Sequence, residues 1–140
     1  MPDSSTITAN CRVAQQLLSQ IEKADAVSRI NRGRTYNSTL DLLFAMNARL
    51  SSNRIAAPHL TELTSDFQNQ LTTWRNNYDH YDDALAAAVD INCTAKPADF
   101  YNQLVNARDQ RQTLNENVKN LNQTINDYKT ELAKVTRELP

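Results

Sequence analysis

Two cysteines far apart in the chain are the residues whose type and spacing point most directly to chemistry. Cys11 and Cys93 are about 80 positions apart, whereas a Cys-x-x-Cys redox motif or a zinc cluster needs closer spacing or more ligands. The pair therefore predicts a disulfide that joins two distant parts of the fold. The alternative is a pair of reduced cysteines packed in the core of a cytoplasmic protein.

The densest polar segment runs from Asp79 to Asp83 and reads Asp-His-Tyr-Asp-Asp. In a helix, Asp79 or His80 would share a face with Asp83, as paired metal ligands do. A metal site needs one or two more ligands from another helix, and a solvated acidic face explains the segment without them. No nucleophile or poised base completes a catalytic set. We therefore expect no catalytic residue, no metal site, no cofactor and no enzymatic activity.

The composition predicts an all-α fold. Glycine occurs once, at Gly33, and there are four prolines, so the sequence lacks the turn residues that many short strands require. Lys plus Arg come to 15 and Asp plus Glu to 16, for a formal net charge of -1. This balance gives no strong field to attract nucleic acid, so we expect no such partner. No apolar run approaches the roughly 20 residues of a membrane span, so we expect none in this chain.

Apolar periodicity predicts three long helices. They are expected over residues 6–52, 60–92 and 97–138. Pro58 and Pro97 suit the first turns of the second and third helices, and Gly33 leaves the first helix continuous, kinked or broken. The expected fold is one domain over residues 1–140, an antiparallel three-helix bundle with coiled-coil-like spacing. At 1.5 Å per residue, about 40 residues span ~60 Å, which predicts a rod.

Steps of three and four residues mark an apolar face on each helix. In the first helix this face reads Cys11, Ala14, Leu17, Leu18, Ile21, Ala24 and Val27, and it resumes at Tyr36, Leu40, Leu43, Met46 and Leu50. In the second helix it reads Leu60, Leu63, Phe67, Leu71, Trp74, Tyr78, Tyr81, Leu85 and Ala88. In the third helix it reads Tyr101, Leu104, Ala107, Arg111, Leu114, Val118, Leu121, Ile125, Tyr128, Leu132, Val135 and Leu139. These positions are the predicted core.

The disulfide agrees with the predicted antiparallel pairing. The midpoint between Cys11 and Cys93 lies at the edge of the loop expected over residues 51–59, and antiparallel helices bring together residues equally distant from such a loop. On the chain-entropy model the bridge would stabilise the fold by up to about 4.5 kcal/mol. Because disulfides persist in oxidising compartments, it also predicts a location outside the cytoplasm. We further expect that a leader peptide before Asp3 has been removed.

One polar layer is predicted within the bundle. Counted from the end that carries the cysteines, Asp25, Asp79 and Arg111 lie at the same level. Arg111 occupies an otherwise apolar face, so we expect it to pair with Asp25 or Asp79 in the core and to fix the helix register. Basic residues gather in the first helix and acidic ones in the second, so opposite charges are also expected to pair along the helix edges.

The chain resembles a family of small exported helical proteins, without a known activity, from ultrasmall bacteria of the candidate phyla radiation. The features that carry the resemblance are Cys11, the stripe of Trp74, Tyr78 and Tyr81, Cys93, the segment Pro97-Ala98-Asp99-Phe100, and Ala107-Arg108. The resemblance extends from about Cys11 to Tyr128. It implies export and a helical rod, and it brings no activity.

The expected function is protein–protein contact at the cell envelope by a non-enzymatic exported bundle whose protein partner is unknown. One alternative is a periplasmic holdase-type chaperone that binds unfolded chains on an exposed apolar face. Another is a cytoplasmic coiled-coil adaptor with reduced thiols. The sequence leaves self-association into a homo-oligomer open.

Overall fold

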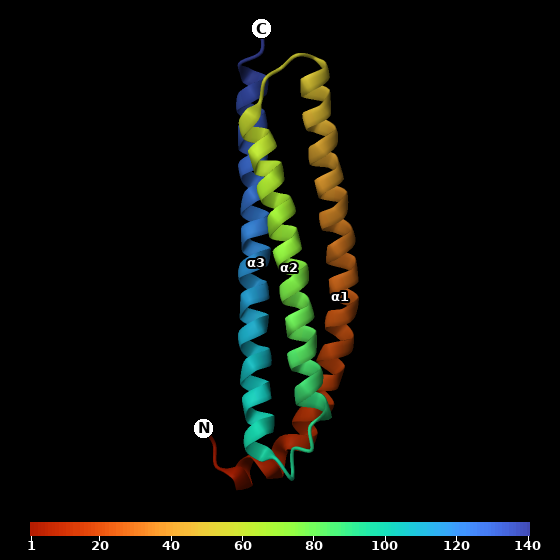
Figure 1. The fold of residues 1–140 in the computed structure, drawn as a ribbon, viewed down its shortest axis with the longest axis vertical. Helices are drawn as coiled ribbons and strands as arrows, with labels where there is room; N and C mark the ends of the chain where they lie inside the picture. Colours follow the sequence, from red (N-terminus) through yellow and green to blue (C-terminus); the bar gives the residue numbers. More distant parts are fainter. The chain divides into compact units, whose positions relative to one another are not determined.

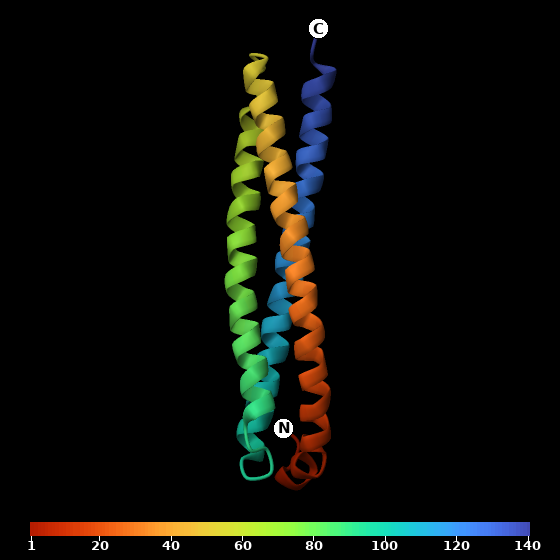
Figure 2. The ribbon, with the colours of Figure 1, turned by 90° about the vertical axis from the view of Figure 1, so that its right-hand side faces the viewer.

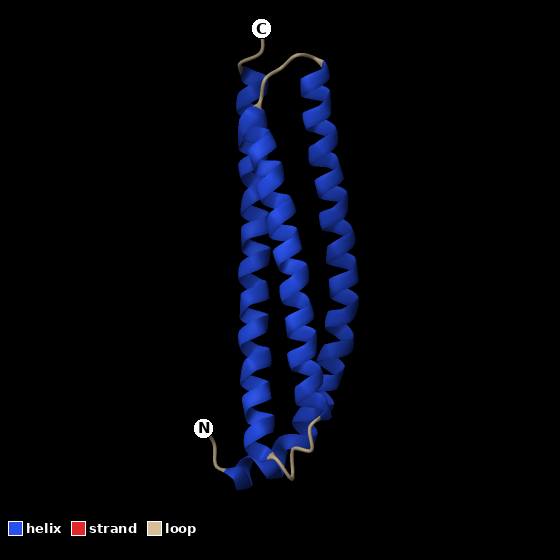
Figure 3. Cartoon of the chain, viewed as in Figure 1, coloured by secondary structure: helices blue, strands red, loops and turns tan.

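The computed structural model describes residues 1–140 and consists of three α-helices without a strand (Figure 1, Figure 3). α1 spans Ser4–Ser52, α2 spans Pro58–Asp90 and α3 spans Pro97–Arg137. The helices pack against one another, and the prediction of an all-α three-helix bundle is confirmed. None of the helices combines the length and apolar character that crossing a membrane requires.

Asp3 sets the start of α1. Its Oδ1 accepts hydrogen bonds from the Thr6 backbone N–H at 2.8 Å and from the Ser5 hydroxyl at 2.7 Å. The hydrogen bond from the Thr6 backbone N–H, with that from Ser5, lowers the pKa of Asp3 because both stabilise the carboxylate. This N-cap satisfies an N–H that would otherwise lack a partner, so α1 starts earlier than residue 6.

The end of α1 is closed by a left-handed residue. Arg54 has φ 59°, and its N–H donates to the Ser51 carbonyl at 3.0 Å. The Ile55 N–H donates to the Leu50 carbonyl at 2.9 Å, which completes a Schellman motif. The chain then enters α2 at Pro58, whose missing N–H costs little at a first helical position.

Gly33 does not break α1, which is continuous from Ser4 to Ser52. A Cβ added at Gly33 would lie 3.9 Å from the Trp74 ring, an ordinary van der Waals distance. The neighbouring helix therefore leaves room for a methyl group, and the glycine is not required by its backbone conformation.

Replacing Gly33 with alanine should raise the free energy of unfolding by about 0.5–1 kcal/mol, because alanine loses less backbone entropy in a helix. Urea unfolding followed by circular dichroism measures the change. A fall in stability would show that the contact with Trp74 cannot accept a methyl group.

The chain packs as two compact units, and each contains a segment of every helix. Unit 1 comprises residues 1–31 and 76–115, and unit 2 comprises residues 32–75 and 116–140. The expectation of a single domain stays a prediction. In unit 1 the first turns of α1 lie beside the connection between α2 and α3 (Figure 1, Figure 2).

α2 supplies the largest share of the core in both units, and all nine residues of its predicted face are buried. In unit 1 these are Tyr78, Tyr81, Leu85 and Ala88, and in unit 2 they are Leu60, Leu63, Phe67, Leu71 and Trp74. In unit 2 the Tyr36 ring stands edge-on to Trp74, with ring centroids 5.3 Å apart. Such aromatic contacts add to the burial of area.

The predicted face of α1 is partly wrong, because Leu17, Ala24 and Val27 are exposed. The face that packs in unit 1 passes through Cys11 and Asp25, which are two heptads apart and point the same way. At about 100° of rotation per residue, Ala24 points about 100° away from Asp25. α1 thus carries apolar residues on two sides, and steps of three and four can be drawn through either.

Candidate functional site

Cys11 and Cys93 form a disulfide, with an S–S distance of 2.04 Å and their Cα atoms 6.0 Å apart. The bridge lies in a small apolar cluster with Ile7 and Phe100. Beside it, the Gln15 amide donates to the carbonyls of Ala88 at 3.1 Å and Ile91 at 2.7 Å. These carbonyls lie in the last turn of α2 and just after it, where a helix has no further N–H groups to donate to its carbonyls. The start of α1 is therefore joined to the end of α2 by a covalent bond and by hydrogen bonds.

Asp25 is the centre of a polar cluster in unit 1. Its Oδ2 accepts a hydrogen bond from the Tyr81 hydroxyl at 2.5 Å and lies 3.3 Å from Arg111 Nη1. The Tyr78 hydroxyl donates to the Asp25 backbone carbonyl at 2.8 Å. The predicted pairing of Arg111 with Asp25 is present. The Arg111 side chain is 51% exposed, however, so the cluster lies at the edge of the bundle rather than in its core.

Asp79 does not belong to this cluster, which corrects the predicted three-residue layer. It lies 2.5 Å from Arg29 Nη2, and Asp82 lies 2.6 Å from Arg29 Nη1. Asp79 stands at the predicted level but on the side of α2 that meets Arg29. The Arg29 guanidinium also lies over the Tyr78 ring, 5.0 Å from its centroid. The two ion pairs of Arg29 with Asp79 and Asp82 agree with the expected pairing of basic residues of α1 with acidic residues of α2.

Burial shifts the pKa values in the cluster formed by Arg29, Asp79 and Asp82. Burial raises the pKa of Asp82, although the positive charge of Arg29 acts in the opposite direction. It also opposes the charge on Arg29, but Asp79 and Asp82 outweigh that effect and raise the pKa of Arg29. Both acids are more than a third exposed, so each pair contributes only about 0–1 kcal/mol and acts mainly on helix register.

The stability of the bundle should fall as pH rises above about 10. Burial raises the pKa of Tyr36, Tyr78, Tyr81 and Tyr128, and the Asp25 carboxylate raises that of Tyr81 further. Since these pKa values are higher in the folded chain, the folded state holds more protons above pH ~10. The contribution is complete below the unfolded pKa and is lost as pH rises through the folded values.

Urea unfolding at several pH values between about 7 and 11 tests this prediction, with tyrosinate absorbance as a second readout. Lysines titrate in the same range, so the control is Tyr81→Phe, which should make the decline with pH shallower. A decline of equal slope in both proteins would contradict the assignment to Tyr81.

The carboxylates of both polar clusters already have hydrogen-bond or ion-pair partners. The Asp25 carboxylate accepts a hydrogen bond from the Tyr81 hydroxyl and forms an ion pair with Arg111. The carboxylates of Asp79 and Asp82 both form ion pairs with Arg29. No group of three His, Cys, Asp or Glu side chains is placed to hold a metal ion. Comparison with known proteins finds no matching family model, no matching curated protein and no matching solved structure.

The outer side of α1 is the most unusual surface of unit 1. Large apolar side chains that remain exposed there are Val13, Leu17, Val27 and Ile30. In unit 2 the exposed Leu42 and Phe44 also belong to α1. The other exposed large apolar residues, Met1 and Leu139, lie near the chain ends. Helices α2 and α3 leave no large apolar side chain exposed within their lengths, so this property is specific to α1.

A groove between α1 and α3 adjoins this surface in unit 1. We call it the α1–α3 groove. Leu18 and Ile21 of α1 form one wall, Leu104 and Ala107 of α3 form the other, and Leu85 of α2 contributes to its floor. Its volume is ≈ 160 Å³. Its position cannot be predicted from the sequence, because the spacing of a heptad face does not show which helix edges come together.

Proposed function

We propose that this chain is a non-enzymatic exported helical bundle that acts by protein–protein contact at the cell envelope. The observation that carries the proposal is the exposed apolar side of α1 in unit 1. Leu17 is 55% exposed and Val27 is 59% exposed, although both are large aliphatic residues. Their side chains would be shielded from water by a bound protein, and several large apolar side chains exposed on one side of a helix support an interaction site.

The arrangement of exposed residues supports contact rather than scattered surface variation. Val13 and Leu17 are four residues apart and therefore neighbours on the helix surface, as are Val27 and Ile30 at a spacing of three. Burying one such side chain fully contributes about 1.5–3 kcal/mol. A partner that covers several of these side chains therefore gains favourable free energy of binding. Such binding requires neither a cofactor nor a reactive group.

The disulfide supports the exported part of the proposal. Reducing compartments keep thiols in the reduced state, whereas secreted and envelope proteins retain disulfides. In this chain the bridge joins Cys11 to Cys93, and both residues are almost fully buried. The resemblance to exported two-cysteine helical proteins points the same way.

A second candidate function, a holdase-type chaperone, is favoured by the same exposed aliphatic side chains and the apolar α1–α3 groove. The two functions differ in the number of partners. A contact protein binds one partner or a few, whereas a holdase binds many unfolded chains and suppresses their aggregation.

Site-specific photo-cross-linking in the cells that produce the protein tests the proposal. A photoreactive residue at Leu17 should give one or a few protein adducts in the extracytoplasmic fraction. The matched control places the same residue at Lys119, an exposed position of α3 in unit 2, and should give none. Equal adducts from both positions, or none from Leu17, would contradict the proposal. A broad smear of adducts, together with suppressed aggregation of an unfolded protein, would favour the holdase.

A further inference from the structure

The size of the α1–α3 groove restricts what it can bind. Pockets for small ligands and cofactors usually have volumes of about 300–1,000 Å³. The groove has ≈ 160 Å³, which suits one or two inserted side chains better than a whole small molecule. Its walls come from two helices that both continue beyond it, so a longer occupant can extend along them.

A row of apolar residues leads into the groove along α1. Val13, Leu17 and Ile21 follow one another at a spacing of four, which places them in one ridge of the helix surface. Leu104 and Ala107 form the facing side on α3. Two such helix surfaces with a depression between them are the seat that an amphipathic helix occupies in helix-in-groove recognition.

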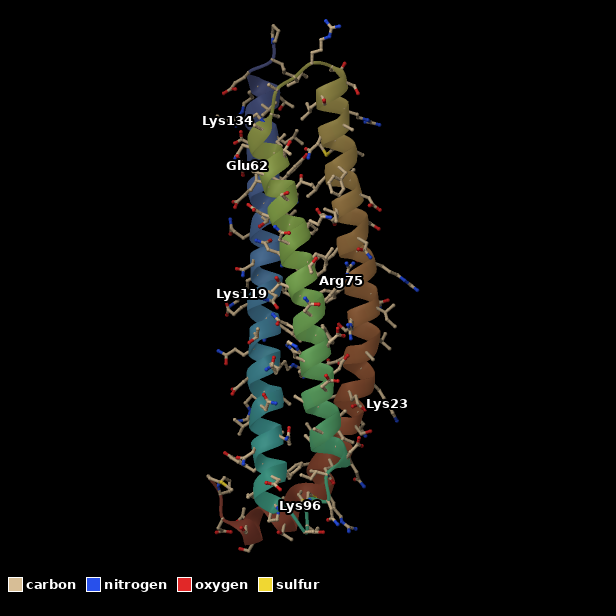
Figure 4. All side chains as sticks on the ribbon, viewed as in Figure 1. Lys23, Glu62, Arg75, Lys96, Lys119 and Lys134 are labelled. Carbon is tan, nitrogen blue, oxygen red and sulfur yellow. A yellow bond between two sulfur atoms is a disulfide. The ribbon has the colours of Figure 1, made fainter.

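Cations border this seat on its α3 side. Arg108 and Arg111 line the α3 wall, and no acidic residue lines the groove. Asp25 partly neutralises Arg111, whereas Arg108 is exposed without an acidic partner. On α1 the exposed cations Arg12 and Lys23 lie on the side of the helix away from Ile21, outside the groove, and Figure 4 shows Lys23 directed away from α2. A second copy of the chain that docked through its own α1 would bring cations onto cations.

From these contacts we infer that the α1–α3 groove binds an amphipathic helix of another protein, with acidic residues flanking its apolar face. Aliphatic anchors at positions i, i+4 and i+7 would fill the groove and cover Leu17, and the flanking acids would lie against Arg108 of the α3 wall. The inference rests on the proposed function, because it names the class of partner for the same surface.

Three synthetic helical peptides serve as probes. They share one apolar face and carry glutamate, lysine or glutamine at the flanking positions. Titration into the oxidised full chain, followed by fluorescence anisotropy, should show that the glutamate peptide binds about tenfold more tightly than the lysine peptide. The difference should shrink as salt is added, because the flanking charges are exposed.

Two pairs of variants locate the binding site. Arg108→Glu should reverse the preference between the glutamate and lysine peptides, and Leu17→Ser should weaken all three peptides about tenfold. Their matched controls in unit 2 are Lys119→Glu, a charge reversal on α3, and Leu42→Ser, an exposed leucine of α1. The controls should bind as the parent does. All four positions are exposed, and thermal melting checks that each variant folds.

The inference is overturned if no peptide binds, if the glutamate and lysine peptides bind equally, or if Arg108→Glu keeps the original preference. It is also overturned if sedimentation shows a dimer that Leu17→Ser dissociates, because a second copy then occupies the surface. If Leu17 cross-links to a partner in cells while the peptides do not discriminate, the inference fails and the proposed function stands. If Leu17 gives no adduct in cells, the proposed function itself fails.

Discussion

Replacing Cys11 and Cys93 together with alanine should lower the free energy of unfolding by about 2–4 kcal/mol, with an upper bound of about 4.5 kcal/mol. The bridge joins residues 82 positions apart, so its loss restores much conformational freedom to the unfolded chain. It also releases the first turns of α1, which pack against Phe100 through Ile7. Urea unfolding without reductant measures the change.

Reduction of the parent protein provides the control for this prediction. A reducing agent should destabilise the parent by about as much as the double substitution does, and it should leave the double variant unchanged. If the variant and the parent unfold at the same urea concentration, the bridge contributes nothing to the stability of unit 1, and its role would lie elsewhere.

Trp74→Ala should cost about 3–5 kcal/mol, because it removes the largest fully buried side chain of the protein. Trp74 contacts the Tyr36 ring, and its ring edge lies beneath Gly33, so the cavity would open between α1 and α2 of unit 2. The remaining side chains come from three helices and can collapse only partly into that space.

The matched control for Trp74→Ala is Phe44→Ala. Phe44 is also aromatic and belongs to unit 2, but it lies on the exposed side of α1. Its loss should change the free energy of unfolding by no more than about 0.5 kcal/mol. Equal costs at the two positions, measured by urea unfolding, would show that the burial assigned to them is wrong.

The sequence predicts α2 well because its large apolar residues occupy one side only. From Leu60 to Ala88, only one path of three- and four-residue steps passes through them, and that path is the core. Pro58 and Pro97 likewise mark the helix starts closely, since proline is tolerated at a first helical position. The disulfide follows from the same antiparallel pairing of α1 with α2.

The sequence predicts α1 poorly in unit 1 because apolar residues occur on both of its sides. The packing face passes through the polar residues Asp25 and Arg29, which bond to residues of α2 and α3. A hydrophobicity pattern alone prefers Ala24 and Val27, which are exposed. Tertiary hydrogen bonds and ion pairs therefore decide the orientation of this helix against its apolar pattern.

The site was only partly predictable for a related reason. Counting residues from the cysteines gives the level of a residue along the bundle, and on this basis Arg111 and Asp25 do meet. Level does not give direction around a helix, so the predicted layer includes Asp79, which lies on another side of α2 and pairs with Arg29. The α1–α3 groove depends in addition on which edges of α1 and α3 approach each other. The helix periodicity does not decide this, because a three-helix bundle can be left-handed or right-handed.

The most direct test of the whole account is the thiol state of the protein inside its own cells. Cells are lysed into an alkylating reagent, and the protein is digested with trypsin without reduction. We predict that mass spectrometry finds the peptide ending at Arg12 linked to the peptide covering residues 76–108. Alkylated Cys11 and Cys93 on separate peptides would contradict both the bridge and the exported function proposed from it.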